Sequence, residues 1–216
     1  MNKPMLKPWL PWLGLLLLLT GCSWGSAPPL TIKQWMLEYP PPPRAAESPL
    51  EARLKLARFS TVRAYLGTEM VYRQESFERR VYPYQRWRVF PSDMVGDLLL
   101  RDLRRCGRLK EVFSYRQRGS ARFRLEGGVE RFLEVDGPKG PRAELGLSIT
   151  LLDTRQKDST KKVLFQKDYA ASQAMKEKKA PALAAALSRA LARVSGQVRA
   201  DVIEAIARAL ETPPGD

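Results

Sequence analysis

Hydrophobic and polar residues alternate along the middle of the chain, and a period of two is typical of strands that bury one face. Residues 121–135 alternate in this way, with a break of phase at Gly127-Gly128 that a β-bulge would produce. After a polar stretch, residues 163–169 indicate a returning strand. The pattern therefore predicts a meander of three long strands with one apolar face. The clearest alternating residues are Leu145, Leu147, Ile149 and Leu151.

Two other stretches carry the helical period of three and four. A start signal at Pro91-Ser92-Asp93 precedes the first of them, which we expect to end near Cys106-Gly107. The second follows Pro181 and is long enough for about eight turns at 3.6 residues per turn. A sheet with one apolar face needs a cover, so both helices are predicted to pack on it. The stripe of the second helix is Leu183, Leu187, Leu191, Val194, Val198, Val202, Ile206 and Leu210.

The first third of the chain has weaker patterns. They predict a strand over 30–39, a polyproline crossing at 40–43, a strand around 54–59 and a turn or short helical piece at 64–67. Two further runs predict a hairpin: Met70 to Arg73 and Phe77 to Tyr82. A weak strand is expected at Val112-Phe113. The predicted fold class is α+β, with a mainly antiparallel sheet covered on one face by a short helix and a long C-terminal helix.

The N-terminus has the three parts of a secretory signal. Lys3 and Lys7 precede a short apolar stretch, and the run Leu19-Thr20-Gly21-Cys22 matches the lipobox of bacterial lipoproteins. The apolar stretch is about half of the roughly 20 residues that a membrane span needs. We therefore expect cleavage before Cys22 and acylation of its thiol. Ser23, in place of an aspartate, favours sorting to the periplasmic face of the outer membrane.

These signals divide the chain into four parts. Residues 1–21 form the signal peptide, 22–29 a lipidated tether, 30–210 a single domain and 211–216 a loose tail. A mature chain of this length and composition suits one globular domain. If Cys22 carries lipid, Cys106 has no intrachain partner, and we expect it to be a small buried residue.

The composition limits the chemistry. The chain has no histidine, which removes the commonest general base and metal ligand, so no catalytic residue, metal or cofactor is predicted. A formal charge of +14 would suggest nucleic acid, but export makes lipid headgroups or an acidic protein surface better partners. A purely solvating role for the charge stays open. An enzyme would have to use carboxylates such as Glu126, Glu130, Glu134 and Asp136, which we interpret as a solvated strand face.

Several segments together resemble a known family. The segments are Trp35 to Leu37, Ala64 to Leu66, Glu69 to Arg73, Val81 to Trp87, Pro91 and Leu98-Leu99. They are similar to the ABC-type transport auxiliary lipoproteins, of which paraquat-inducible protein C is the best-known type. The resemblance spans most of residues 30–210, and the meander followed by a terminal helix fits it as well.

The resemblance implies a non-catalytic docking component of an ABC-type system that moves phospholipid or other hydrophobic molecules between membranes. It implies three partners, namely a cytoplasmic ATPase, a permease and a periplasmic protein with a mammalian-cell-entry domain. Homo-oligomerisation is left open. The aromatic residues with a polar tip are candidates for partner contact, with a plain core role as the alternative. They are Trp35, Tyr65, Tyr72, Tyr84 and Trp87.

One alternative function is a lipoprotein that regulates a cell-wall synthesis machine. Such proteins usually reach inward on a long disordered linker. Here about 8 residues separate Cys22 from the first predicted strand, which span at most about 29 Å when fully extended. The short tether favours the transport interpretation.

Overall fold

The structure is a computed structural model that describes residues 30–74, 77–156, 158 and 162–211. Ile32–Asp216 form one compact unit, and every element below belongs to it. The predicted signal peptide, lipobox and tether lie outside the described residues, as does the tail from residue 212 onward. Cleavage, acylation and sorting therefore stay predictions.

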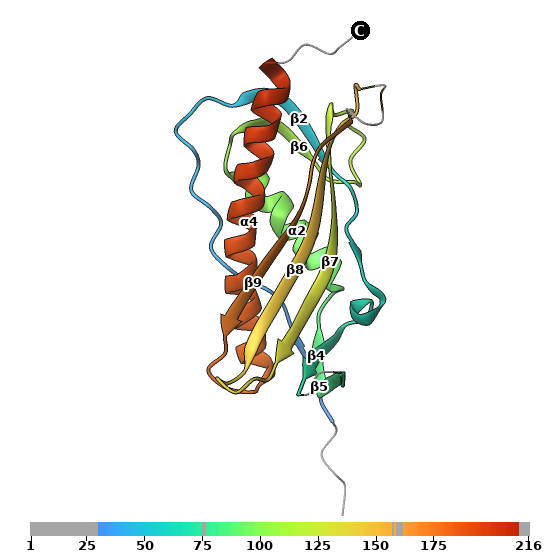
Figure 1. Cartoon of the computed structure of the whole chain (residues 1–216), viewed down its shortest axis with the longest axis vertical. Coiled ribbons are helices and arrows are strands. Elements are labelled where there is room, and N and C mark those ends of the chain that lie inside the picture. Colours follow the sequence, from blue (N-terminus) through green and yellow to red (C-terminus); the bar gives the residue numbers. More distant parts are fainter. Residues whose placement is uncertain (1–29, 75–76, 157, 159–161, 212–216) are drawn as a thin grey trace, which may run out of the picture. The chain divides into compact units, whose positions relative to one another are not determined.

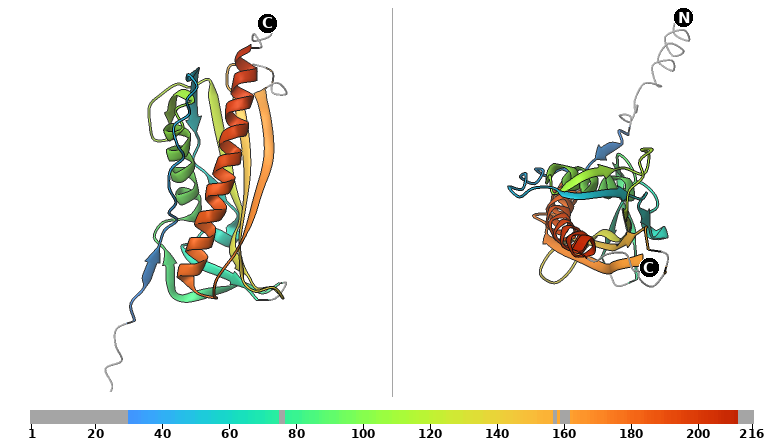
Figure 2. Two further views of the ribbon diagram at one scale, coloured as in Figure 1. Left: turned by 90° about the vertical axis from the view of Figure 1, so that its left-hand side faces the viewer. Right: turned by 90° about the horizontal axis from the view of Figure 1, so that it is seen from above.

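Within the described residues, nine strands form one curled sheet organised around β7 (Phe123–Val135) (Figures 1 and 2). Along one edge, β7 pairs in antiparallel register with β8 (Arg142–Asp153), from Phe123↔Asp153 to Val135↔Arg142. In turn, β8 pairs antiparallel with β9 (Val163–Ala174) over its whole length. The predicted meander of three long strands is confirmed.

The shorter described strands are β1 (Lys33–Trp35), β2 (Leu50–Leu56), β3 (Ser60–Thr61), β4 (Glu69–Arg73), β5 (Arg80–Trp87) and β6 (Leu109–Phe113). Strands β2, β3 and β4 follow one another along the second edge of β7, each in parallel. Strand β6 continues the sheet beyond β2 in parallel, while β5 pairs antiparallel with β4 and carries β1 in parallel. The long ladders are thus antiparallel, and most of the short pairings are parallel.

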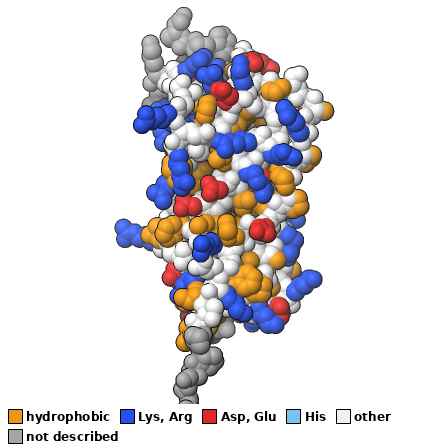
Figure 3. Space-filling view, turned by 180° about the vertical axis from the view of Figure 1, so that it is seen from behind, with side chains coloured by type: hydrophobic (Ala, Val, Ile, Leu, Met, Phe, Trp, Pro, Cys, Tyr) orange, Lys and Arg blue, Asp and Glu red, His pale blue; other side chains and the backbone are white. Residues whose placement is uncertain are grey.

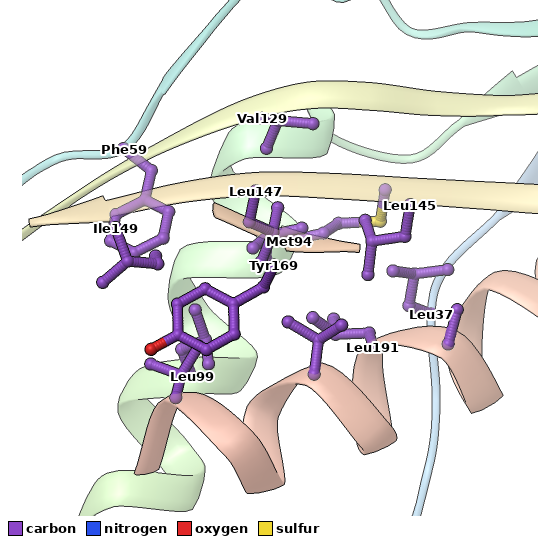
Figure 4. Packing of buried hydrophobic residues seen from close by; sticks show 14 of the residues in the cluster. Leu37, Phe59, Met94, Leu99, Val129, Leu145, Leu147, Ile149, Tyr169 and Leu191 are labelled. Atoms are coloured by element: carbon purple, nitrogen blue, oxygen red, sulfur yellow. The ribbon is translucent and has the colours of Figure 1, made fainter. Parts of the chain in front are cut away.

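The predicted helices are confirmed as α2 (Pro91–Arg105) and α4 (Ala180–Glu211), and the predicted turn contains a short 3₁₀ helix, η1 (Arg63–Tyr65). Both long helices pack on the same face of the sheet, where their apolar stripes are buried except for Leu210, which is exposed. Figure 4 shows the close-up of this core, with Leu145 and Leu147 of β8 near Leu191 of α4. Cys106 follows α2 as a buried free thiol, as predicted.

The first predicted strand is wrong in its extent, because only Lys33–Trp35 pairs in the sheet. Beyond Trp35 the chain leaves the sheet and packs on the helices. Leu37 is buried, and the backbone N–H of Glu38 donates to Ser188 Oγ of α4 at 3.0 Å. The second predicted strand is displaced, since β2 begins at Leu50 and ends at Leu56.

The break of phase in β7 also lies later than predicted. Gly127 and Gly128 pair in register with β8, and the bulge falls between Val129 and Arg131. Gly127 is needed for a different reason. A Cβ at this position would lie 2.3 Å from the ring of Phe59, which packs between β7 and α2. The glycine therefore makes room for an aromatic ring in the core.

Candidate functional site

Four of the five predicted contact residues lie at one end of the sheet, which is formed by β1, β4, β5 and the residues next to them. We call residues 32–36, 69–73 and 77–88 the hairpin end. Strand β1 joins it through the register Lys33↔Gln85 to Trp35↔Trp87. The indole N–H of Trp35 donates to Gln85 Oε1 at 2.7 Å, which ties the first strand to β5. Figure 1 shows β4 and β5 at the lower end of the molecule.

Tyr84 has an unusual backbone in this region. Its φ is 56°, and it is the one non-glycine residue of the described chain with positive φ. For a bulky residue this left-handed conformation costs roughly 1–2 kcal/mol. The side chain is 48% exposed, so core packing does not repay that cost. Backbone strain of this kind clusters at functional sites, which makes Tyr84 a candidate for one.

The hairpin end leaves several large apolar side chains in solvent. Phe77 is 98% exposed, the highest value among the large hydrophobic residues that the structure describes. By extension of the β1–β5 register, Ile32 lies beside Tyr84. Single exposed apolar residues are ordinary, but a group at one end of a domain is typical of an interaction surface. Its members are Ile32, Met36, Phe77, Val81 and Tyr84.

The five predicted aromatic residues divide by burial. Trp87 is 1% exposed and packs edge-on against Phe132 with ring centroids 5.2 Å apart, and Tyr65 is also buried. Trp35 and Tyr72 are half-buried, and Tyr84 is exposed. The structure thus brings Trp35, Tyr72, Tyr84 and Trp87 into the hairpin end and places Tyr65 just outside it, in η1. Tyr84, Tyr72 and Trp35 are the three that reach the surface.

Charge at the hairpin end is mostly positive, with six lysines and arginines against two glutamates. Arg80 pairs with Glu78 at 2.6 Å, and the guanidinium of Arg88 donates to Gln34 Oε1. Figure 3 shows the back face of the molecule, where Lys and Arg side chains are scattered among hydrophobic ones. On this face the positive charge is spread and interleaved with apolar surface.

Two of the four candidate carboxylates lie behind this end of the sheet. The interpretation of all four as a solvated face is wrong for Glu134, which is 1% exposed. The bulge before it reverses the phase of β7, so Glu134 points inward. Tyr82 OH donates to Glu134 Oε2, and Lys178 Nζ lies 2.9 Å from Asp136 Oδ2.

These contacts and the burial of both groups change the pKa values of Glu134 and Tyr82. Burial raises the pKa of the Glu134 carboxyl, and the hydrogen bond from Tyr82 opposes the rise only in part. Burial, together with the bond to Glu134, raises the pKa of the Tyr82 phenol. The other two acids lie elsewhere on β7, where Glu126 pairs with Arg124 at 3.0 Å and Glu130 accepts from Ser148 at 3.1 Å. The bonds of Glu134 and Glu130 tie strands together, and the Asp136 carboxylate beside Glu134 also raises the pKa of Glu134.

A second polar cluster escaped the sequence analysis. Asp102 of α2 is 2% exposed, and its Oδ2 accepts from Tyr39 OH at 2.8 Å and from Ser195 Oγ of α4 at 2.6 Å. Arg101 donates to Asp102 Oδ1 at 2.9 Å and to the Tyr39 carbonyl at 3.0 Å. Burial and the bond to Asp102 raise the pKa of Tyr39. This cluster fastens the segment after β1 to both helices.

A signal for that cluster exists in the sequence. Asp102 follows Val95 and Leu99 at helical spacing, and Ser195 falls between Leu191 and Val198 on the buried stripe of α4. A polar residue on the apolar face of each of two helices predicts a buried hydrogen bond.

A basic hollow lies away from the hairpin end, near Leu210 at the end of α4. It encloses about 400 Å³ and is lined by Arg53, Lys110 and Arg122. Each of these cations is already paired: Arg53 with Glu111 at 2.6 Å, Lys110 with Glu51 at 2.5 Å and Arg122 with Asp153 at 2.7 Å. The three paired carboxylates offset most of the positive charge of the hollow, to which Arg155 also contributes.

Among the described residues, no group of three or more His, Cys, Asp or Glu side chains could hold a metal ion. In the same part of the chain, no helix combines the length and the hydropathy that crossing a bilayer requires.

Comparison with known families decides the classification. Residues 36–199 match the family described as the ABC-type transport auxiliary lipoprotein component. This chain belongs to that family. The auxiliary lipoprotein family carries an association with ABC transport systems, and the segments that first suggested it, from Trp35 to Leu99, lie within the matched range except for Trp35 itself. The resemblance found in the sequence is thereby confirmed.

Solved structures support the fold of this auxiliary lipoprotein. The crystal structure of protein XCC0632 from Xanthomonas campestris is 20% identical, with a TM-score of 0.73 over 83% of this chain and 100% of that one. The crystal structure of an uncharacterized protein is 13% identical, with a TM-score of 0.62 over 80% of this chain and 99% of that one. At such low identities the likeness shows the fold alone. No curated protein matches the chain.

Proposed function

We propose that this auxiliary lipoprotein is acylated on Cys22 and acts, without catalysis, as a docking component at the periplasmic face of the outer membrane. Its transport system would contain an ATPase, a permease and a periplasmic protein with a mammalian-cell-entry domain, and would carry phospholipid or another hydrophobic cargo. The observation that carries the proposal is the family match over residues 36–199. The lipobox Leu19-Thr20-Gly21-Cys22 followed by Ser23 supports the anchor and its location.

The way the chain enters the fold supports a tethered role. Strand β1 begins at Lys33, eleven residues after the proposed lipid, and Tyr39 is fastened to both helices through Asp102. Force on the tether would therefore be transmitted to a paired strand and to a buried hydrogen-bond cluster. A body held this firmly by its N-terminal segment suits a component that keeps a transporter at a membrane.

The contacts of the acidic residues support a role without catalysis. Glu134 accepts from a tyrosine, Asp136 pairs with Lys178, and Asp102 accepts from Tyr39 and Ser195. Each of these carboxylates completes a structural contact. We propose that the surface aromatics Tyr84, Tyr72 and Trp35 contribute to docking, while Tyr65 and Trp87 support that surface from within the fold.

The test is crosslinking in the native envelope. A photoreactive residue would replace Tyr84 or Tyr115 one at a time, and the crosslinked products would be identified by mass spectrometry. Tyr115 is exposed but lies outside the hairpin end, so it is the matched control. We expect envelope protein of an ABC system, or lipid of the bilayer that holds it, to be crosslinked from position 84 and not from 115. Recovery of cell-wall synthases from position 84 would contradict the proposal and favour the alternative function.

A further inference from the structure

The surface of the hairpin end combines apolar and cationic groups. Five exposed hydrophobic residues, from Ile32 to Tyr84, share it with six lysines and arginines. Apolar rings that enter the headgroup region and cations that meet lipid phosphates are the two components of interfacial membrane binding. The chemistry of this end fits an anionic bilayer.

The most exposed residues lie at the edge of the fold. Phe77 lies at the start of the segment that leads into β5, and its ring is 98% exposed. Tyr84 is held outward by a left-handed backbone, with its neighbour Gln85 fixed to Trp35 of β1. Rings held in this way can enter a headgroup layer without rearrangement of the core.

The tether limits how far this end can be from the membrane. Ten residues lead from Cys22 to Ile32, so the distance is at most about 36 Å when that segment is fully extended. Strand β1 then pairs directly with β5, which carries Tyr84. The far end of α4 is remote by comparison, because 32 helical residues cover about 48 Å. The hairpin end is the part of the domain that the anchor keeps close to lipid.

We propose that the hairpin end lies on the bilayer, with Phe77, Tyr84 and Ile32 in the headgroup region and its arginines and Lys33 against anionic lipid phosphates. This deepens the proposed function, on whose Cys22 anchor the tether argument rests. The lipid then fixes the position of the domain, and the hairpin end fixes which side faces the membrane.

The test uses the mature chain with Cys22→Ser, so that no acyl chain contributes to binding. Sedimentation with vesicles of phosphatidylcholine is compared with sedimentation with vesicles that also contain phosphatidylglycerol. We expect binding to the anionic vesicles that weakens as salt is raised. The double substitution Phe77→Ser and Tyr84→Ser should lower the affinity at least about tenfold, since it removes two rings from the headgroup layer. Tyr115→Ser, at an exposed tyrosine elsewhere, should leave it unchanged.

A second measurement covers the case in which the double variant folds poorly. An environment-sensitive dye is placed on Phe77→Cys or on Tyr115→Cys in the Cys22→Ser chain, where the remaining Cys106 is buried. Emission should shift to the blue with anionic vesicles for position 77 only. The proposal is overturned if the chain sediments with neither vesicle type or if Tyr115→Ser weakens binding as much as the double substitution. It is also overturned if the emission of neither dye shifts. Because the assay contains no lipid anchor and no transporter, it can succeed even if the proposed function fails.

Discussion

The helix-covered meander and the hairpin end belong to one sheet but differ in how far their large apolar side chains are exposed to solvent. In the meander, Leu145, Leu147, Ile149 and Leu151 are at most 1% exposed beneath α4. At the hairpin end, Phe77, Val81 and Tyr84 are 45% exposed or more. The helices of the chain cover the apolar face of the meander, whereas these three side chains of the hairpin end are exposed to solvent.

The difference separates stability from function. Buried leucines of the meander hold the fold through the area that they remove from water. Exposed rings contribute little to folding, and we attribute those of the hairpin end to contact outside the chain, as proposed above. Substitutions in the meander should therefore change unfolding free energy, and those at the hairpin end should change binding.

The largest expected effect is a cavity under α4. Leu191 is fully buried, and Leu191→Ala should lower the free energy of unfolding by about 2–5 kcal/mol. Phe77→Ala at the hairpin end should change it by less than about 0.5 kcal/mol. Urea titration of the mature Cys22→Ser chain measures both. Equal losses of unfolding free energy in the two variants would contradict the distinction between the two regions.

Next comes the cluster that fastens the N-terminal segment. Asp102→Ala leaves Tyr39, Ser195 and Arg101 without their acceptor and should cost about 3 kcal/mol. Asp102→Asn keeps one acceptor oxygen and should cost less. Denaturant unfolding gives the two values, and an alanine variant as stable as the unaltered chain would show that the cluster does not fasten the segment.

Smaller changes in stability, of opposite sign, are expected for two glycines. Gly127→Ala would bring a Cβ within 2.3 Å of the ring of Phe59 and should cost about 1–3 kcal/mol. Gly196→Ala on α4 meets nothing within 4 Å and should instead stabilise by up to about 1 kcal/mol. Thermal unfolding of both variants checks the signs. If Gly127→Ala were neutral, Phe59 would not pack as described.

The smallest effect concerns pH. Burial raises the pKa of Glu134 in the fold, so the folded protein keeps a proton that the unfolded chain has already released. Stability should therefore fall as pH rises from the unfolded pKa through the folded one. Glu134→Gln should remove this fall, while the opposite contribution of Asp201, whose pKa is lowered by Lys167 and Tyr169 despite its burial, cancels in the comparison. Unfolding free energies measured upward from about pH 4, close to the ordinary pKa of a glutamate, give the difference, and parallel profiles would contradict it.

Regular periods were enough to predict the meander and both helices, because each element buries one apolar stripe, which changes phase only at the bulge of β7. The parallel partners of β7 could not be predicted in the same way. Alternation says which face of β2 or β4 is buried, but it does not say which strand lies beside it. The first strand was predicted too long because Leu37 and Tyr39 are apolar for packing on helices, and not for pairing in the sheet.

The candidate site was only partly visible in the sequence. The β5 aromatics could be selected by residue type, but Trp87 and Tyr84, three positions apart, differ from 1% to 48% in exposure. Strand alternation already places residues three positions apart on opposite faces, but it does not say which of the two faces is buried. Glu134 was placed in solvent because its inward direction depends on a bulge whose position the glycines suggested wrongly.

The central claim is that this folded body is held at a bilayer through Cys22. The most direct measurement is tandem mass spectrometry of the N-terminal peptide of the protein extracted from membranes of its own cells. The account predicts that the mature chain begins at Cys22 and that this residue carries diacylglycerol. A mature chain that begins at another residue, or an unmodified Cys22 in membrane-extracted protein, would contradict it.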